Sequence, residues 1–207
     1  MPIPTLTKNE ILIKVEGSQI NPADLNGITR VYKDYINKFK SPYIPGIEGV
    51  GLVVDIGDKS SENQTKLLNK KVAFVTVNGS WSEFVKVDPR FTLAIDDSMI
   101  KNDEWISYCN PITVMCMLDI AKKAKAKSIV QTGASSSCGK MLIKACKLNN
   151  IKTINIVRKE EHVKPLLEIG ADIVLLQDDK NFKDLFKSSV KKLGASIAFE
   201  CVAGNFG

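Results

Sequence analysis

Histidine and paired cysteines are nearly absent from this chain. His162 is the only histidine among 207 residues, and the five cysteines are widely spaced, with no Cys-x-x-Cys pair. A structural zinc needs about four thiolate or imidazole ligands, which usually come in close sequence pairs. The sequence therefore predicts no metal site, and it predicts reduced thiols of the kind found in the cytoplasm.

Long apolar runs are missing as well. The longest candidate, over 112–118, is much shorter than the roughly 20 residues that cross a bilayer. The first residues show no basic stretch followed by an apolar core, which is the pattern of a secretory signal. We therefore expect no membrane partner and a cytoplasmic location, or a mitochondrial one if a presequence precedes Met1.

The excess of positive charge is dispersed. The net charge of +6 invites comparison with nucleic-acid-binding proteins. The lysines, however, are scattered, and their densest group, over 122–127, falls at the end of an expected helix, where the helix dipole favours cations. We interpret these lysines as a solvated face and expect no nucleic-acid partner.

The chain has two differently patterned parts. Residues 1–102 contain short β-branched runs separated by Gly/Pro turns, which predicts a small β-barrel or sandwich. Residues 103–207 alternate between helical and apolar strand-like segments, which predicts a parallel sheet covered on both faces. The strands expected in the first part are 10–15, 50–56, 72–77 and 82–87. In the second part we expect helices over 105–126, 138–148, 160–169 and 181–193, and strands over 128–131, 153–157, 173–176 and 197–201.

Both parts look incomplete. A doubly wound dinucleotide domain usually has two βαβαβ halves, and this sequence supplies one half and the first strand of the second. At the other end, a strand begins near Glu10 with almost nothing before it. We expect a piece of a longer protein that lacks N-terminal strands and the C-terminal part of the dinucleotide domain.

A serine-rich turn follows the strand over 128–131 and opens a helix. Compared with the usual Gly-x-Gly-x-x-Gly motif, Ala134 and Ser136 stand where the first two glycines would be, and Gly139 keeps the third place. The N–H groups of a helix N-terminus and the serine hydroxyls can still bind a pyrophosphate. A helix cap without a ligand is the alternative. The candidate cofactor-binding residues here are Gly133, Ser135, Ser136, Ser137, Cys138 and Gly139.

The second strand of this part ends in two cations. Dinucleotide domains that bind NAD place an Asp or Glu about 20 residues beyond the glycine turn. Here Arg158 and Lys159 occupy that place. A carboxylate would repel a 2′-phosphate, whereas a guanidinium binds it with two hydrogen bonds. The sequence predicts NADPH as the cofactor; a surface arginine at a strand end is the alternative.

Several segments, taken in order and spacing, resemble the medium-chain dehydrogenase/reductase superfamily, within its zinc-free quinone oxidoreductase and 2-enoyl thioester reductase branches. The resemblance implies an N-terminal GroES-like β-barrel domain followed by a Rossmann domain, here truncated, with catalysis in the cleft between them. The carrying segments are Glu10-Ile11-Leu12-Ile13-Lys14-Val15, Ile20-Asn21-Pro22-Ala23-Asp24, Pro45-Gly46-Ile47-Glu48-Gly49-Val50-Gly51, Gly79-Ser80-Trp81-Ser82-Glu83-Phe84, Asn110-Pro111-Ile112-Thr113, the serine-rich turn and Ile169-Gly170-Ala171-Asp172.

The departures from the zinc-dependent branch define the expected chemistry. That branch carries a cysteine ligand where this sequence has Asn21, and a histidine where it has Ile47. Neither residue is a zinc ligand. The resemblance therefore implies an NADPH-dependent oxidoreductase that transfers a hydride to an activated double bond of a 2-enoyl thioester, an enone or a quinone. The charge that then spreads into an enolate is stabilised by a hydrogen-bond donor rather than by a metal.

The resemblance also implies the catalytic groups. Tyr32 lies a short way past the Asn-Pro motif, where the enoyl thioester reductases use a tyrosine to hold the carbonyl oxygen, and Tyr35 is a rival. Asn21 would line the cleft for nicotinamide and substrate, and Thr113 would touch the nicotinamide. A turn-forming Asn and a helix-capping Thr are the alternatives.

Three readings of the function remain open. The first is a reductase that acts on a small-molecule substrate and forms a homodimer when full length. The second is a non-catalytic or RNA-binding zinc-free relative, for which the positive charge gives weak support. The third is an inactive fragment of such a reductase, because half of the nucleotide domain is missing.

Overall fold

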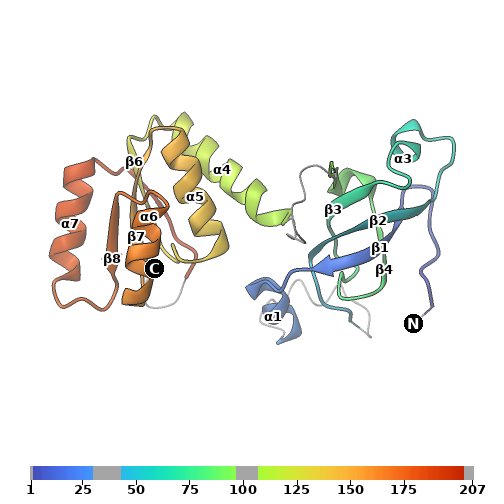
Figure 1. Cartoon of the computed structure of the whole chain (residues 1–207), viewed down its shortest axis with the longest axis horizontal. Coiled ribbons are helices and arrows are strands. Elements are labelled where there is room, and N and C mark those ends of the chain that lie inside the picture. Colours follow the sequence, from blue (N-terminus) through green and yellow to red (C-terminus); the bar gives the residue numbers. More distant parts are fainter. Residues whose placement is uncertain (1, 30–42, 97–106, 203–207) are drawn as a thin grey trace. The chain divides into compact units, whose positions relative to one another are not determined.

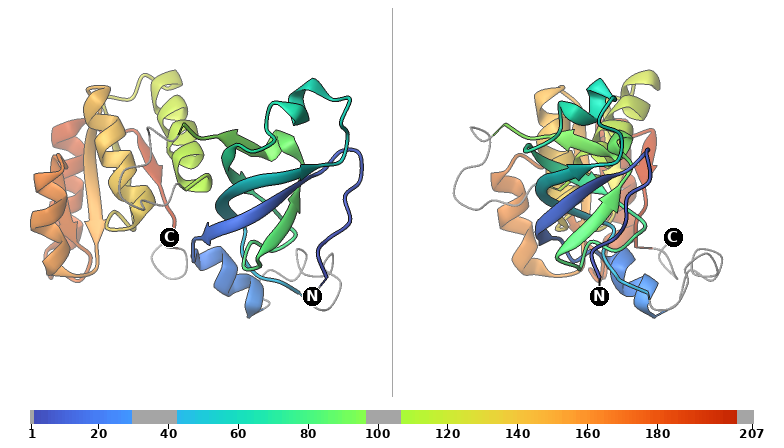
Figure 2. Two further views of the ribbon diagram at one scale, coloured as in Figure 1. Left: turned by 45° about the vertical axis from the view of Figure 1, so that its right-hand side comes forward. Right: turned by 90° about the vertical axis from the view of Figure 1, so that its right-hand side faces the viewer.

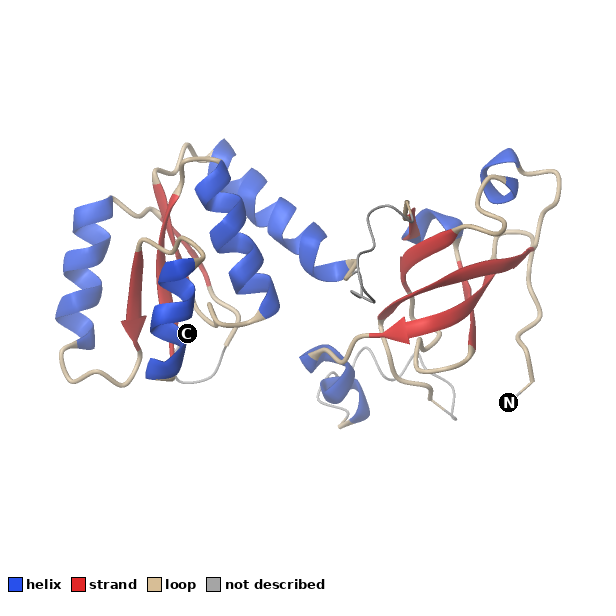
Figure 3. Cartoon of the chain, in the orientation of Figure 1, coloured by secondary structure: helices blue, strands red, loops and turns tan. Residues whose placement is uncertain are grey.

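The protein is described by a computed structural model that covers residues 2–29, 43–96 and 107–202. The chain divides into two compact units, Met1–Cys109 and Asn110–Gly207. The first consists mainly of strands and the second alternates helices with strands, as predicted (Figure 3). The boundary expected between residues 102 and 103 lies in the range 97–106, outside the described residues.

The first unit is built on a five-stranded antiparallel sheet in the order β4-β1-β2-β3-β5 (Figure 1). Its strands are β1 (Ile11–Ser18), β2 (Glu48–Ile56), β3 (Lys71–Val75), β4 (Phe84–Val87) and β5 (Thr92–Ala94). Alternate side chains face one core because successive residues of a strand point to opposite faces. Ile11 and Ile13 of β1 are fully buried there together with Phe74 of β3, whereas Lys14 is exposed.

Two short helices lie at opposite ends of this sheet (Figure 2). Helix α1 (Pro22–Ile28) follows β1, and α3 (Glu62–Thr65) connects β2 with β3. The sequence predicted only a turn at Asn21-Pro22, and that prediction was incomplete. Asn21 is the N-cap of α1 and Pro22 is its first residue. Proline is favoured there because the N–H that it lacks has no partner within the helix.

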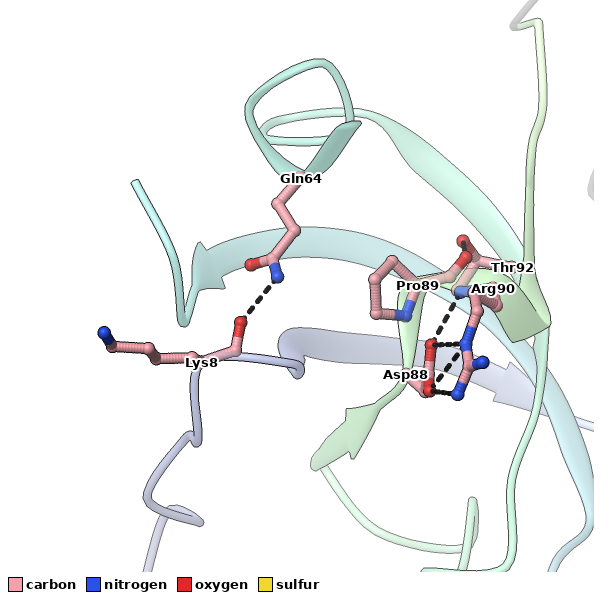
Figure 4. A network of polar contacts seen from close by, with 6 residues as sticks. All are labelled: Lys8, Gln64, Asp88, Pro89, Arg90 and Thr92. Atoms are coloured by element: carbon pink, nitrogen blue, oxygen red, sulfur yellow. Dashed lines mark hydrogen bonds and ion pairs between the residues drawn. The ribbon is translucent and has the colours of Figure 1, made fainter. Parts of the chain in front are cut away.

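Polar side chains fasten the connections of the first unit (Figure 4). Gln64 of α3 is buried, and its side-chain N–H donates to the carbonyl of Lys8 at 2.7 Å. Arg90 binds both carboxylate oxygens of Asp88, and the shorter contact, from Nη2, is 2.7 Å. These hydrogen bonds hold the pKa of Asp88 below its usual value. The guanidinium of Arg90 is therefore already bound to a neighbouring carboxylate.

The second unit holds a four-stranded parallel sheet in the order β8-β7-β6-β9. Its elements are α4 (Cys109–Lys123, whose first residue still counts with the first unit), β6 (Ser128–Gln131), α5 (Ser137–Leu148), β7 (Lys152–Val157), the 3-10 helix η3 (Glu160–His162), α6 (Val163–Glu168), β8 (Ile173–Leu176), α7 (Phe182–Leu193) and β9 (Ile197–Phe199). The bounds predicted for β6 and β8 are those observed. The single helix predicted over 160–169 is divided into η3 and α6.

Helices cover both faces of the parallel sheet (Figure 1). Helices α5 and α6 pack on the face that carries Ile129, Val157 and Val174, and α4 packs against α5. Helix α7 packs on the opposite face, against Ile154 and Leu175. Among residues 2–29, 43–96 and 107–202, no helix combines the length and apolar character needed to span a lipid bilayer.

We predict that Phe74→Ala lowers the free energy of unfolding of the first unit by about 3–5 kcal/mol, because it leaves a cavity among fully buried side chains. Urea unfolding followed by tryptophan fluorescence measures this unit, since both tryptophans, Trp81 and Trp105, belong to it. Phe91→Ala is the matched control: Phe91 is 51% exposed, and its truncation should change the stability by less than about 0.5 kcal/mol. Equal losses for the two variants would contradict the assigned core.

Candidate functional site

A fully buried carboxylate organises the polar centre of the first unit. Glu48, the first residue of β2, accepts hydrogen bonds from the backbone N–H groups of Tyr108 and Cys109, both at 2.7 Å. The side-chain amide of Asn21 donates to the same carboxylate at 2.8 Å, and the hydroxyl of Ser107 donates at 3.2 Å. A buried charge is tolerated when several donors replace its water. Glu48 therefore joins α1, β2 and the segment that enters α4.

A second buried carboxylate supports the first. Asp24 of α1 accepts the backbone N–H of Asn21 at 2.7 Å and that of Ile47 at 2.9 Å. Asn21 is consequently held at its backbone by Asp24 and at its side chain by Glu48. This geometry fixes the position of Asn21. Its expected contact with nicotinamide or substrate stays a prediction.

The thiol of Cys109, which lies near Glu48, has low reactivity. Burial, followed by the nearby negative charge of Glu48, raises the pKa of Cys109 to about 12. A thiol with this pKa is protonated at neutral pH and is a poor nucleophile. Across the ranges that the structure covers, no group of three or more His, Cys, Asp or Glu side chains is arranged to hold a metal ion.

In the second unit, the predicted phosphate-binding residues form one turn between β6 and α5. Gly133 has a φ of +58°, a left-handed conformation that favours glycine. Ser136 is the N-cap of α5, and its hydroxyl accepts the N–H of Gly139 at 3.1 Å. A Cβ at Gly139 would lie 2.6 Å from the carbonyl oxygen of Ala134, so only glycine lets the helix approach the turn this closely.

The first N–H groups of α5 remain available to a ligand. Among the described residues, no hydrogen bond is formed by the backbone N–H groups of Ser135, Ser137 or Cys138. Unsatisfied N–H groups at a helix N-terminus bind anions, and the helix dipole adds to the attraction. The turn thus has the groups required to bind a phosphate.

The two cations predicted for the 2′-phosphate follow the neighbouring strand. Strands β6 and β7 are paired in parallel, and the N–H of Ala134 in the turn lies 3.4 Å from the carbonyl of Ile156. Arg158 comes two residues later, is exposed, and forms no ion pair with any described residue. Lys159 is paired with Glu161 at 3.4 Å. Of these two cations, Arg158 is therefore the one that has no carboxylate partner among the described residues.

The positions of three other candidate site residues are known in less detail. Thr113 is exposed on the first half of α4. Tyr32 and Tyr35 lie in the range 30–42, outside the described residues. The roles expected for these residues remain predictions.

Sequence reasoning missed a buried amide pair beneath the turn. Gln131 is the last residue of β6, and Asn155 stands opposite it in β7. Both are buried, and they are joined by a hydrogen bond of 2.8 Å. The available signal was a polar amide residue in each of two otherwise largely apolar strands, but sequence spacing does not show that the two amides are partners.

The chain is similar to known oxidoreductases over nearly its whole length. Residues 7–97 match the family model of the alcohol dehydrogenase GroES-like domain. The mitochondrial enoyl-acyl-carrier-protein reductase of Caenorhabditis elegans is 32% identical over 201 residues, which are 95% of this chain and 56% of that protein. The quinone oxidoreductase of Mus musculus is 26% identical over 211 residues, which are 97% of this chain and 60% of that protein.

Solved structures of oxidoreductases are also similar to this chain. A protein of Bacillus thuringiensis assigned as an NADPH:quinone reductase superposes with a TM-score of 0.84 at 26% identity, over 99% of this chain and 60% of that one. The chain thus spans a little more than half the length of the curated relatives and solved structures that it matches.

We predict that Glu48→Gln lowers the free energy of unfolding of the first unit by about 1–3 kcal/mol, because an amide cannot accept all the donors that face this carboxylate. Glu62→Gln is the control: Glu62 is exposed in an ion pair with Lys66, and its change should cost less than about 0.5 kcal/mol. Tryptophan-monitored urea titrations compare the two variants. A Glu48→Gln protein as stable as the control would show that this carboxylate does not organise the unit.

Proposed function

The chain belongs to the medium-chain dehydrogenase/reductase superfamily, among its enoyl reductases and quinone oxidoreductases, and on that premise we propose that the protein reduces an activated double bond with NADPH. The substrates we propose are 2-enoyl thioesters, enones or quinones. The observation that carries the proposal is the turn between β6 and α5, with free N–H groups beside an unpaired Arg158.

The chain's own groups account for the choice of NADPH over NADH. The N–H groups of Ser137 and Cys138 would hold the pyrophosphate, and Arg158 would hold the 2′-phosphate of the adenosine ribose. An aspartate or glutamate at position 158 would favour NADH instead, because it accepts the ribose hydroxyls and repels a phosphate. NADPH, once bound, supplies the hydride.

We propose that the reaction proceeds without zinc. Asn21 and Ile47 stand where the zinc-dependent branch has metal ligands, and the Asn21 amide is bound to Glu48 instead. Reduction at the far carbon of a conjugated carbonyl moves negative charge onto the carbonyl oxygen, where a hydrogen-bond donor can stabilise it. We assign that donor to the phenol of Tyr32, and we place Asn21 and Thr113 along the nicotinamide.

The compartment and the assembly are also proposals. Several curated relatives are named as mitochondrial enoyl-acyl-carrier-protein reductases, which favours the mitochondrial alternative over the cytoplasmic location expected from the sequence. The homodimer expected for the full-length protein stays a prediction.

We predict that Arg158→Ala weakens NADPH binding by about 10- to 100-fold and leaves NADH binding unchanged, because only NADPH carries the 2′-phosphate. Fluorescence titration of the purified protein with each dinucleotide measures this. Arg90→Ala is the control, since Arg90 is also exposed but is bound to Asp88 in the first unit. Equal losses for NADPH and NADH, or no loss for either, would remove the role given to Arg158.

We predict that Tyr32→Phe lowers kcat with a short-chain 2-enoyl thioester or a quinone by about 100-fold or more and leaves the KM for NADPH unchanged. The loss is expected because the phenol would act on the substrate oxygen and not on the dinucleotide. The assay follows NADPH absorbance, and a zinc chelator should not change the rate. Tyr35→Phe is the matched variant and should retain full activity; the reverse result would transfer the role to Tyr35.

A further inference from the structure

The buried amide pair connects the phosphate turn to the interior of the parallel sheet. Gln131 is 3% exposed, and its side-chain nitrogen donates both to the carbonyl oxygen of Gly139 at 3.1 Å and to the side-chain oxygen of Asn155 at 2.8 Å. Asn155 is fully buried and donates in turn to the hydroxyl of Thr153 at 2.8 Å and to the carbonyl of Ile173 at 3.0 Å. One continuous chain of hydrogen bonds therefore runs from the first turn of α5 through β6 and β7 to β8.

We infer that Gln131 and Asn155 are positioning residues for the dinucleotide pyrophosphate. This inference rests on the proposed binding of NADPH. Gly139 carries the carbonyl that Gln131 holds, and the N–H of Gly139 is held by Ser136. Both polar groups of this glycine are thus fixed by side chains, directly beside the free N–H groups of Ser137 and Cys138.

Apolar packing alone would not fix the helix along its axis. Helix α5 also packs on the sheet through apolar side chains, among them Leu142 and Ile143. Such contacts are non-directional, whereas a hydrogen bond prefers a narrow range of distance and angle. One residue of helix is a rise of about 1.5 Å, which is enough to move an N–H group out of bonding distance from a phosphate oxygen.

The composition of the strands supports a positioning role. Leucine or methionine at 131 and 155 would fill the same interior without any need for hydrogen bonds. Instead, every N–H of the two amides has an acceptor, and the network reaches the turn rather than closing on itself. A buried network in which every amide N–H has an acceptor favours one arrangement of the elements that it joins.

The test compares two ligands that share the 2′-phosphate, of which only NADP⁺ carries the pyrophosphate. 2′-AMP lacks the pyrophosphate together with the nicotinamide riboside. We expect Gln131→Met to weaken NADP⁺ binding by about tenfold and to change 2′-AMP binding by less than about twofold, as measured by calorimetry on the purified protein. Loss of folded protein would instead reduce the measured number of sites for both ligands together.

Two further variants complete the design. Ser128→Ala is the matched control, because Ser128 is fully buried in the same strand and donates to the carbonyl of Leu193, far along the strand from the turn. It should leave both affinities unchanged. Asn155→Leu retains Gln131 but removes its partner, and it should show the same selective loss. It also serves as the test if Gln131→Met does not fold.

The outcomes separate this inference from the proposed function. Unchanged NADP⁺ affinity in Gln131→Met and Asn155→Leu, with the wild type binding NADP⁺, would overturn the positioning role alone. Equal weakening of NADP⁺ and 2′-AMP would overturn it as well, because the pair would then act on the unit as a whole. A folded wild-type protein that binds neither ligand would overturn the proposed function and the inference together.

Discussion

The contact between Gly139 and Ala134 is the constraint on which the second unit depends. Helix α5 can begin within a few residues of β6 only because its first turn touches the backbone of the preceding turn, with no side chain between them. This approach brings the hydroxyl of Ser136 onto the N–H of Gly139, and the N–H groups of Ser137 and Cys138 have no hydrogen-bond partner among the described residues. It also seats Ile143 against Val157 and Leu166 in the core beneath α5 and α6. The packing of the unit and the groups proposed to bind phosphate therefore have the same origin.

In both units, the buried polar side chains form hydrogen bonds with specific partners. In the first unit, the charge of Glu48 is stabilised by backbone N–H groups and by the amide of Asn21, without a cation among the described contacts. In the second unit, two neutral amides join a helix to three strands. A buried polar group is costly unless its hydrogen bonds are made, so each network admits one arrangement of its elements. Asn21 belongs to the first network, and the second reaches Gly139, which follows Ser137 and Cys138 in α5.

The sequence predicted the elements with local signals and missed those that depend on distant partners. Strands β6 and β8 are short apolar runs bounded by polar residues, and their predicted bounds are the observed ones. Strand β5 has three residues, too few to show alternation, and α1 was hidden because Asn-Pro is common to turns and helix starts. The two backbone donors of Glu48 lie 60 and 61 residues away in the chain, and the pairing of Gln131 with Asn155 depends on the register of two strands. Neither relation can be derived from spacing.

The turn between β6 and α5 shows where a degenerate glycine motif can lose a glycine and where it cannot. Glycine stands at 133, directly before the motif, where φ is positive, and it is retained at the third place of the motif, 139, where a Cβ would meet backbone. Ser136 has a φ of −67° and a ψ of 163°, an extended conformation open to any residue, and Ala134 is buried in the core beneath α5. The two replaced glycines therefore stand where the backbone tolerates a side chain, and the replacement at 136 supplies the hydroxyl that caps the helix. The turn thus keeps its backbone conformation and the close approach of α5 with only one of the three motif glycines, because conformation and crowding, rather than the count of glycines, decide where a side chain is excluded.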